Sequence, residues 1–389
     1  MNAMLSLSAT HLTMLCPNNE RYNCAAMSFL TKSIQDFRTN LSAPITLENC
    51  DPLMGTAILI HYLSWCNLEF LEIQPGLEDD CSPEIAHLDL AKDQMFLLSP
   101  GVRQIFFVSW PFFQRKNSVF VEIALLKPCN SLEDSLEPQN INFQINAHGF
   151  TDIFDDPVYS GNPRAPLPAA PPATPSYSSP PPEFCPSRAE IFQLLTMPTT
   201  LTPDTDVQSS VHPTWDLNLV RDEQQEMSIY PSLSPSPLPR PLTPQAADLA
   251  EALSPPAVHG DREAVLRAAY DRMVARLSVV LCFMPDAHFP STANLLSPTP
   301  VPMPQKADLE KYILSFPLLC FGPFLELILA GDSRALVVLY HFYRAARVLL
   351  PTWQSWWCGR RASVMETLIR SELEARGLDA CIATAPCAI

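Results

Sequence analysis

The stretch from Pro323 to Arg376 constrains the fold most, because three helix patterns follow one another there with almost no loop between them. Gly322-Pro323 predicts the start of the first helix, since proline in the first helical turn loses no hydrogen bond. Gly331 predicts its end, because glycine readily adopts the left-handed conformation that closes a helix. So much helix in so few residues indicates a packed helical module, and it contains no recognisable catalytic motif.

The second and third helices of this module are predicted from capping residues and apolar spacing. Asp332 or Ser333 can cap the second helix, and Pro351 stops it. A third helix is expected to end at Gly377. Apolar residues recur every three or four positions in both, as on one helix face. Those of the second are Ala335, Val338, Leu339, Phe342, Ala346 and Leu349, and those of the third are Trp353, Trp356, Trp357, Val364, Met365, Leu368 and Leu373.

The charge balance argues against direct nucleic-acid binding by this chain alone. Its formal net charge is -16, and an acidic surface repels a phosphate backbone. The nearest thing to a basic patch is Arg360-Arg361, with Arg344 and Arg347 on the preceding helix. We expect these arginines to lie on solvated helix faces.

The 12 cysteines form no CxxC pair, and several lie in or beside apolar helical runs. Such cysteines usually behave as small buried hydrophobic residues, and we expect reduced thiols in a nuclear or cytosolic protein. The run from Met1 to Cys16 is apolar but lacks the basic residues of a signal peptide. It is expected to form an amphipathic helix, as if the chain began within a domain.

The composition divides the chain into three parts. Residues 128–256 hold more than half of the 41 prolines, mixed with Ser, Thr and Ala, which is typical of a disordered linker. Residues 1–127 and 257–380 are rich in helix patterns and nearly lack alternating strand patterns. We therefore predict an all-α helical bundle interrupted by this linker. Its two halves are expected to form one domain, because each has more apolar face than it could bury alone.

Helix boundaries in the N-terminal half follow from capping residues and prolines. Asn18 is expected to cap a helix that ends before Pro44, and Asp51-Pro52 to start the next. Further helices are expected over residues 85–98 and from Ser99-Pro100 onward, with Pro111 ending or kinking the latter. A short apolar segment is expected over residues 119–126. In the C-terminal half, a long helix is expected over residues 261–283.

The run from Tyr312 to Ala330 has nearly the length of a membrane span, with Glu326 as its only charge. Pro317 and Pro323 interrupt it, so two short core helices are the preferred interpretation and no membrane span is expected.

The motifs of common enzymes are absent. Only 10 glycines occur and none forms GxG, so neither a Rossmann fingerprint nor a P-loop is present. There is no GxSxG and no HExxH. His61 and His341 lie on apolar helices, where a single histidine is usually a hydrogen-bonded core residue. We therefore expect no enzyme.

Three segments together carry a family resemblance. They are residues 48–65 (ENCDPLMGTAILIHYLSW), 98–113 (LSPGVRQIFFVSWPFF) and 315–351 (SFPLLCFGPFLELILAGDSRALVVLYHFYRAARVLLP). In this order they resemble the C-terminal regulatory region of fungal zinc-cluster transcription factors, in the branch similar to sterol uptake control proteins. The resemblance covers most of residues 1–127 and 261–377.

The resemblance implies an all-α effector domain that dimerises, acts in the nucleus on RNA polymerase II genes and, in some members, senses a small apolar ligand such as a sterol. Family members also carry an N-terminal six-cysteine module that holds two zinc ions. Cys16 and Cys24 do not fit that module, so no cofactor is assigned to this chain. Zinc is expected only if such a module lies upstream, and DNA is reached only through it or through a partner.

Five aromatic and aliphatic residues are candidate walls of an apolar ligand pocket, although ordinary core packing is an alternative for all of them. They are Phe106, Trp110, Leu339, Phe342 and Trp357. The alternative function is a stand-alone interaction protein that forms a heterodimer with a zinc-cluster factor. A third hypothesis, an enzyme or lipid carrier with an unfamiliar helical site, has no motif behind it.

Overall fold

The computed structural model describes residues 1–71, 88–125, 128–137, 143–160, 262–285, 303–350 and 355–379. In these ranges the chain forms twelve α-helices and two short 3-10 helices, and it forms no strand. The predicted all-α class is thereby confirmed for the described residues. Contacts group residues 1–197 and 264–389 into one unit, and residues 198–263 into another that lies almost wholly outside the described residues.

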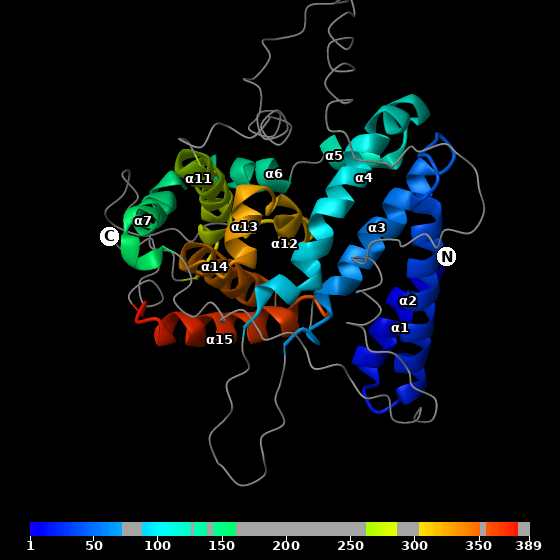
Figure 1. The fold of residues 1–389 in the computed structure, drawn as a ribbon, viewed down its shortest axis with the longest axis horizontal. Coiled ribbons are helices and arrows are strands. Elements are labelled where there is room, and N and C mark those ends of the chain that lie inside the picture. The colour runs from blue at the N-terminus through cyan, green and yellow to red at the C-terminus, as the bar shows by residue number, and fades with distance from the viewer. Residues whose placement is uncertain are drawn as a thin grey trace, which may run out of the picture. The chain divides into compact units, whose positions relative to one another are not determined.

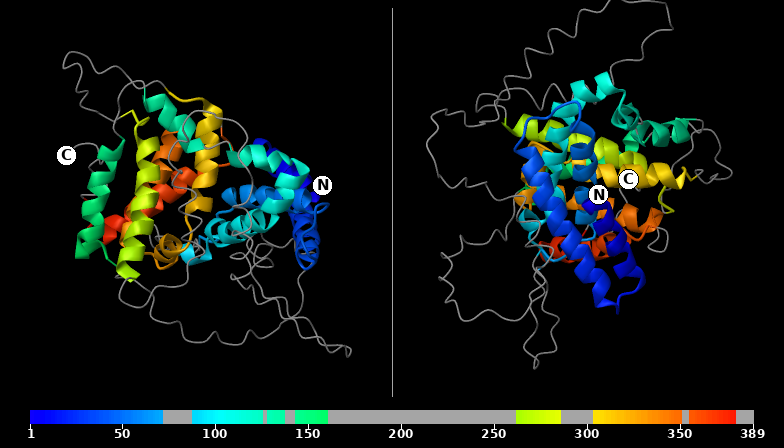
Figure 2. Two further views of the ribbon diagram at one scale, coloured as in Figure 1. Left: turned by 90° about the horizontal axis from the view of Figure 1, so that it is seen from above. Right: turned by 90° about the vertical axis from the view of Figure 1, so that its right-hand side faces the viewer.

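Five helices form the N-terminal part of the larger unit (Figure 1). They are α1 (Asn2–Leu15), α2 (Glu20–Leu41), α3 (Cys50–Trp65), α4 (Gln94–Lys116) and α5 (Val119–Leu125). Helix α1 packs along α2, and α3 packs along α4 (Figure 2). Most of their buried apolar side chains form one hydrophobic cluster, which we call the N-terminal cluster.

Seven further helices surround a second and larger cluster, which we call the main core. They are α6 (Pro128–Leu136), α7 (Gln144–Asp155), α11 (Arg262–Leu281), α12 (Lys306–Leu319), α13 (Pro323–Leu329), α14 (Ser333–Leu349) and α15 (Gly359–Ala375). Helix α14 lies at its centre, because most of its side chains are buried, and α15 packs along it. Trp65 of α3 and Phe96 of α4 also belong to this core, so both halves of the sequence contribute to it.

Several predicted helix ends are confirmed. Asp332 caps α14, its carboxylate accepting a hydrogen bond of 2.9 Å from the Arg334 backbone N–H. Gly331 and Gly377 have φ values of 63° and 74°, the left-handed conformation expected just after a helix. Residues 306–329 form two helices, as predicted, with a bend of 88° between them. No single helix among the described residues is long and apolar enough to cross a membrane, and this bent pair passes only by length and composition.

Other predicted boundaries are wrong. Helix α4 continues through Pro100, where the sequence predicts the start of a new helix. It also continues through Pro111, where the sequence predicts an end or a kink, so the predicted end is wrong. Each proline removes one backbone hydrogen bond, but α4 is held by apolar residues in both clusters, and this packing outweighs the loss. Two predicted N-caps differ from the observed ones by one or two residues. Asn19, rather than Asn18, caps α2. Helix α3 begins at Cys50 after the N-cap Asn49, where the sequence predicts Asp51 as the N-cap. Helix α15 begins at Gly359, so Trp356 and Trp357 lie in the turn before it.

The predicted linker begins too early. Residues 128–136 and 144–155 are helical, and they place four apolar side chains in the main core: Leu132, Leu136, Phe150 and Phe154. Tyr270 of α11 donates a hydrogen bond of 3.1 Å to the Phe150 carbonyl, which ties α7 to the C-terminal half. The linker prediction for residues 161–256 lies outside the described residues.

Candidate functional site

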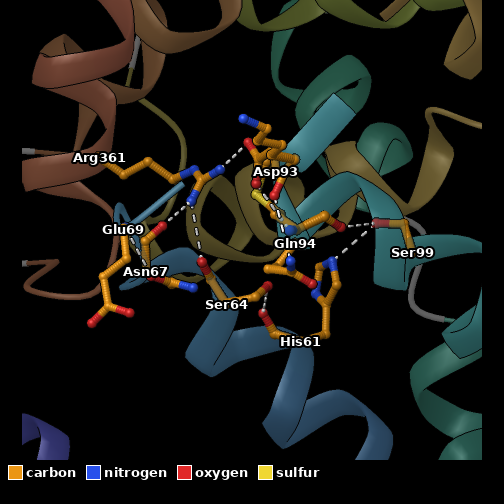
Figure 3. Close-up of polar contacts among 10 residues, drawn as sticks. His61, Ser64, Asn67, Glu69, Asp93, Gln94, Ser99 and Arg361 are labelled. Atoms are coloured by element: carbon orange, nitrogen blue, oxygen red, sulfur yellow. Dashed lines mark hydrogen bonds and ion pairs between the residues drawn. The ribbon is translucent and has the colours of Figure 1, made fainter. Parts of the chain in front are cut away.

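The most distinctive polar site of the described chain is a buried arginine that contacts both halves of the sequence (Figure 3). Arg361, in the first turn of α15, is 1% exposed. Its Nη2 pairs with the Asp93 carboxylate, and its Nη1 donates hydrogen bonds of 3.1 Å and 2.7 Å to the carbonyls of Ser64 and Asn67. Figure 3 shows the guanidinium between Asp93 and the end of α3. One side chain from the C-terminal half therefore links the end of α3 to the start of α4.

The charges of this site match the ends of the two helices. The last carbonyls of a helix lack partners within it and carry partial negative charge, so a cation stabilises them. Arg361 occupies that position at α3. Asp93 is the N-cap of α4, where its carboxylate accepts a hydrogen bond of 3.0 Å from the Met95 N–H. An anion is favourable at that end of a helix, so the ion pair and the two helix ends reinforce one another.

The sequence predicts that Arg361 lies on a solvated helix face, and this prediction is wrong because Arg361 is buried. Arg360 is exposed and Arg347 is 44% exposed in its pair with Glu366, but Arg361 is enclosed by the main core. Arg361 stands four residues before Met365 and eight before Ile369, both fully buried. This spacing places it on the buried stripe of α15, and is the signal in the sequence that could have identified it.

His61 and Ser99 extend the polar site between α3 and α4. His61 Nε2 lies 3.1 Å from Ser99 Oγ, and the Ser99 hydroxyl donates to the Met95 carbonyl at 2.7 Å. Because Ser99 donates its hydroxyl proton to the Met95 carbonyl, Ser99 Oγ can only accept a hydrogen bond from His61. His61 Nε2 therefore carries a proton and donates it to Ser99 Oγ. A histidine that activated a serine nucleophile would have to accept the serine proton instead. The pair therefore acts structurally, and the prediction that His61 is a hydrogen-bonded core residue is confirmed.

Six buried side-chain polar atoms lack a hydrogen-bond partner within the described residues, and Arg361 Nε is one of them. The others are Trp65 Nε1, Asn67 Nδ2, Gln94 Oε1, Ser109 Oγ and Tyr343 Oη. Burial raises the pKa of Tyr343, and the nearby Arg361 opposes this. Burial also raises the pKa of Asp93, again opposed by Arg361. The arrangement holds an ion pair inside the core.

Burial, with a smaller contribution from the Arg361 charge, lowers the pKa of His61 from 6.5 to about 3. An unfolded chain binds a proton at His61 below about pH 6.5, whereas the folded chain does not, so the stability linked to His61 is lost as the pH falls. We expect the folded state to lose about 2 kcal/mol between pH 7.5 and pH 5 through this residue. Urea unfolding at both pH values should show a smaller loss for His61→Gln than for the parent. Equal losses in the two proteins would contradict the lowered pKa.

The five predicted pocket residues divide between the two clusters. Phe106 and Trp110 are partly buried and pack against the N-terminal cluster, with their ring centroids 5.4 Å apart. Leu339, Phe342 and Trp357 lie in the main core. The five therefore do not come together as one set, because the sequence cannot show which helix faces share a cluster. An apolar ligand pocket in either cluster stays a prediction.

The three family-like segments do come together. The first is almost wholly α3, the second lies within α4, and the third runs from the end of α12 through α14. Trp65 and Phe342 have ring centroids 6.2 Å apart, and Phe316 stacks on Phe342 at 4.1 Å. Arg103 of α4 donates a hydrogen bond of 3.2 Å to the Leu318 carbonyl of α12. Segments that lie far apart in the sequence thus form one contact network.

Comparisons with protein-family models, with curated proteins and with solved structures found no match to this chain. Within the described residues, no group of three or more His, Cys, Asp or Glu side chains could hold a metal ion.

Proposed function

We propose that this chain is the regulatory region of a transcriptional regulator related to the zinc-cluster factors. It would act in the nucleus on genes of RNA polymerase II, would have no enzymatic activity of its own, and would contact the transcription machinery through its helical surface. DNA would be reached through a zinc module outside this chain or on a partner. The regulated signal would be a small apolar ligand such as a sterol.

The observation that supports this proposal is the contact network of the three family-like segments. Phe342 of the third segment packs against Trp65 of the first, and Arg103 of the second binds the Leu318 carbonyl of the third. Regulation by a domain of this kind needs a folded helical body rather than a reactive centre. In the described chain, the central polar residues are used for packing and helix ends. Arg361 joins the two halves, and the His61–Ser99 pair is arranged for structure and not for proton abstraction.

The direct test is to fuse the full chain to an unrelated DNA-binding domain and measure a reporter gene in fungal cells. We expect expression to change severalfold relative to the DNA-binding domain alone. Arg361→Met should weaken the change, because it destabilises the contact between the two halves, whereas Arg360→Met should retain it. A reporter that does not respond to the parent fusion would contradict the proposal and favour the alternative of an interaction protein acting through a zinc-cluster partner.

A further inference from the structure

Helix α1 presents its large apolar residues to solvent and its small residues to the protein. Its buried residues are Ala3, Ser6, Ala9 and Thr10, and Ser6 donates a hydrogen bond of 3.0 Å to the Ala26 carbonyl of α2. Large apolar side chains on the opposite face are exposed, among them Met1, Met4, Leu5, Leu12 and Leu15. Met4 is 63% exposed and Leu15 is 64% exposed. The largest exposed apolar patch of a protein is often a binding surface.

The spacing of these residues makes the face complementary to itself. Two copies of α1 laid antiparallel, with Ser8 at the crossing point, pair Met4 with Leu12 and Met1 with Leu15. Ser8 is small, so two helix backbones can approach closely there. A twofold-symmetric dimer needs a self-complementary surface, because the same patch of both copies forms the interface and the two patches run in opposite directions.

The absence of charged side chains on α1 and the exposed area of its apolar face are both compatible with a second copy of this chain as the partner. The sequence of α1 contains no Asp, Glu, Lys or Arg, so the pairing would bury no ion pair, although two chains of net charge -16 repel one another at longer range. The five side chains expose on the order of 500 Å² per copy, so that pairing would bury about 1,000 Å² in total, the lower limit for a specific interface. A lipid surface is less favourable, because this face has no Lys or Arg to contact anionic headgroups.

We propose that α1 is a homodimer interface, in which the faces of Met4, Ser8 and Leu12 from two copies of this chain pack antiparallel about a twofold axis. The modest area predicts a reversible dimer that is strengthened by salt, because salt screens the repulsion between the acidic chains. The argument depends on α1 alone and does not rest on the proposed regulatory function.

Sedimentation of the full chain at several concentrations tests the proposal. We expect a monomer–dimer equilibrium, and Met4→Glu or Leu12→Lys should each weaken it about 100-fold, because the twofold axis places two unpaired charges in the interface. The double variant Met4→Glu/Leu12→Lys should restore roughly a tenth or more of the parent affinity, since the introduced carboxylate of one copy then faces the introduced ammonium group of the other. In a parallel pair like charges would meet, so the double variant would not recover.

Ile123→Glu serves as the matched control, because Ile123 is also an exposed apolar residue, 49% exposed, but lies on α5. It should leave the dimer unchanged. Circular dichroism should show all variants folded, since each substituted side chain is exposed. A parent chain that stays monomeric at high concentration and high salt, or a dimer indifferent to both single variants, would overturn the proposal. So would a monomer that binds phosphatidylcholine vesicles through Met4 and Leu12.

Discussion

Replacing Arg361 with methionine is expected to lower the free energy of unfolding by about 3–5 kcal/mol. The substitution leaves the Asp93 carboxylate buried without its partner, and it removes the donor to the carbonyls of Ser64 and Asn67. Methionine fills much of the same volume, so the loss comes from polar groups that remain unpaired rather than from a cavity. Urea unfolding followed by circular dichroism at neutral pH measures the difference.

The matched control is Arg360→Met, one residue earlier in the same helical turn. Arg360 is exposed, so this change should cost less than about 0.5 kcal/mol. Asp93→Asn in the Arg361→Met background should recover part of the loss, because it removes the unpaired charge and keeps the cap of α4. Equal effects of the two arginine substitutions would show that Arg361 does not hold the halves together.

Replacing Phe342 with alanine is expected to cost about 3–5 kcal/mol. The ring is fully buried, stacks on Phe316 at 4.1 Å and approaches Trp65 from the N-terminal half. Its removal leaves a cavity where both halves meet, and the surrounding helices are too constrained to fill it. Thermal and urea unfolding of the two proteins give the difference.

Val158→Ala is the control for Phe342→Ala. It removes an apolar side chain that is 66% exposed and should change the free energy of unfolding by less than about 0.5 kcal/mol.

Addition of a sterol distinguishes the two interpretations of Phe342, as a wall of a ligand pocket or as a packing residue. If it lines a ligand pocket, a sterol should stabilise the parent protein but not Phe342→Ala. If it is only a packing residue, the sterol should shift neither melting temperature. A loss below about 1 kcal/mol without ligand would contradict its central place in the core.

Local sequence signals predicted helix ends correctly where interactions between neighbouring residues decide the structure. Proline in a first turn, an aspartate cap and a left-handed glycine act within a few residues, so Gly331, Asp332 and Gly377 could be assigned without knowing what surrounds them. The same signals failed at Pro100 and Pro111, because the packing of α4 outweighs the local cost of a proline. They also failed at residues 128–136 and 144–155, where two helices are held by contacts with distant elements.

The candidate site could be predicted only in part, and for a related reason. The core role of His61 follows from its place on an apolar helix. The ion pair of Arg361 with Asp93 does not, because the two residues are 268 positions apart and each looks like an ordinary polar residue in its own helix. Likewise, Phe106 and Phe342 have similar local patterns, yet Phe342 is buried in the main core and Phe106 is only partly buried against the N-terminal cluster.

The sequence by itself determined that this chain is helical, where many of its helices lie and that its two halves carry apolar faces, since periodicity and capping are local properties. Only the tertiary structure decided which faces meet, that an arginine is enclosed among them, and that the large side chains of α1 are left outside. These outcomes depend on how segments that are distant in the sequence pack against one another. A buried charge is tolerated only where its partners converge on it, and an apolar residue is buried only where another element arrives to cover it.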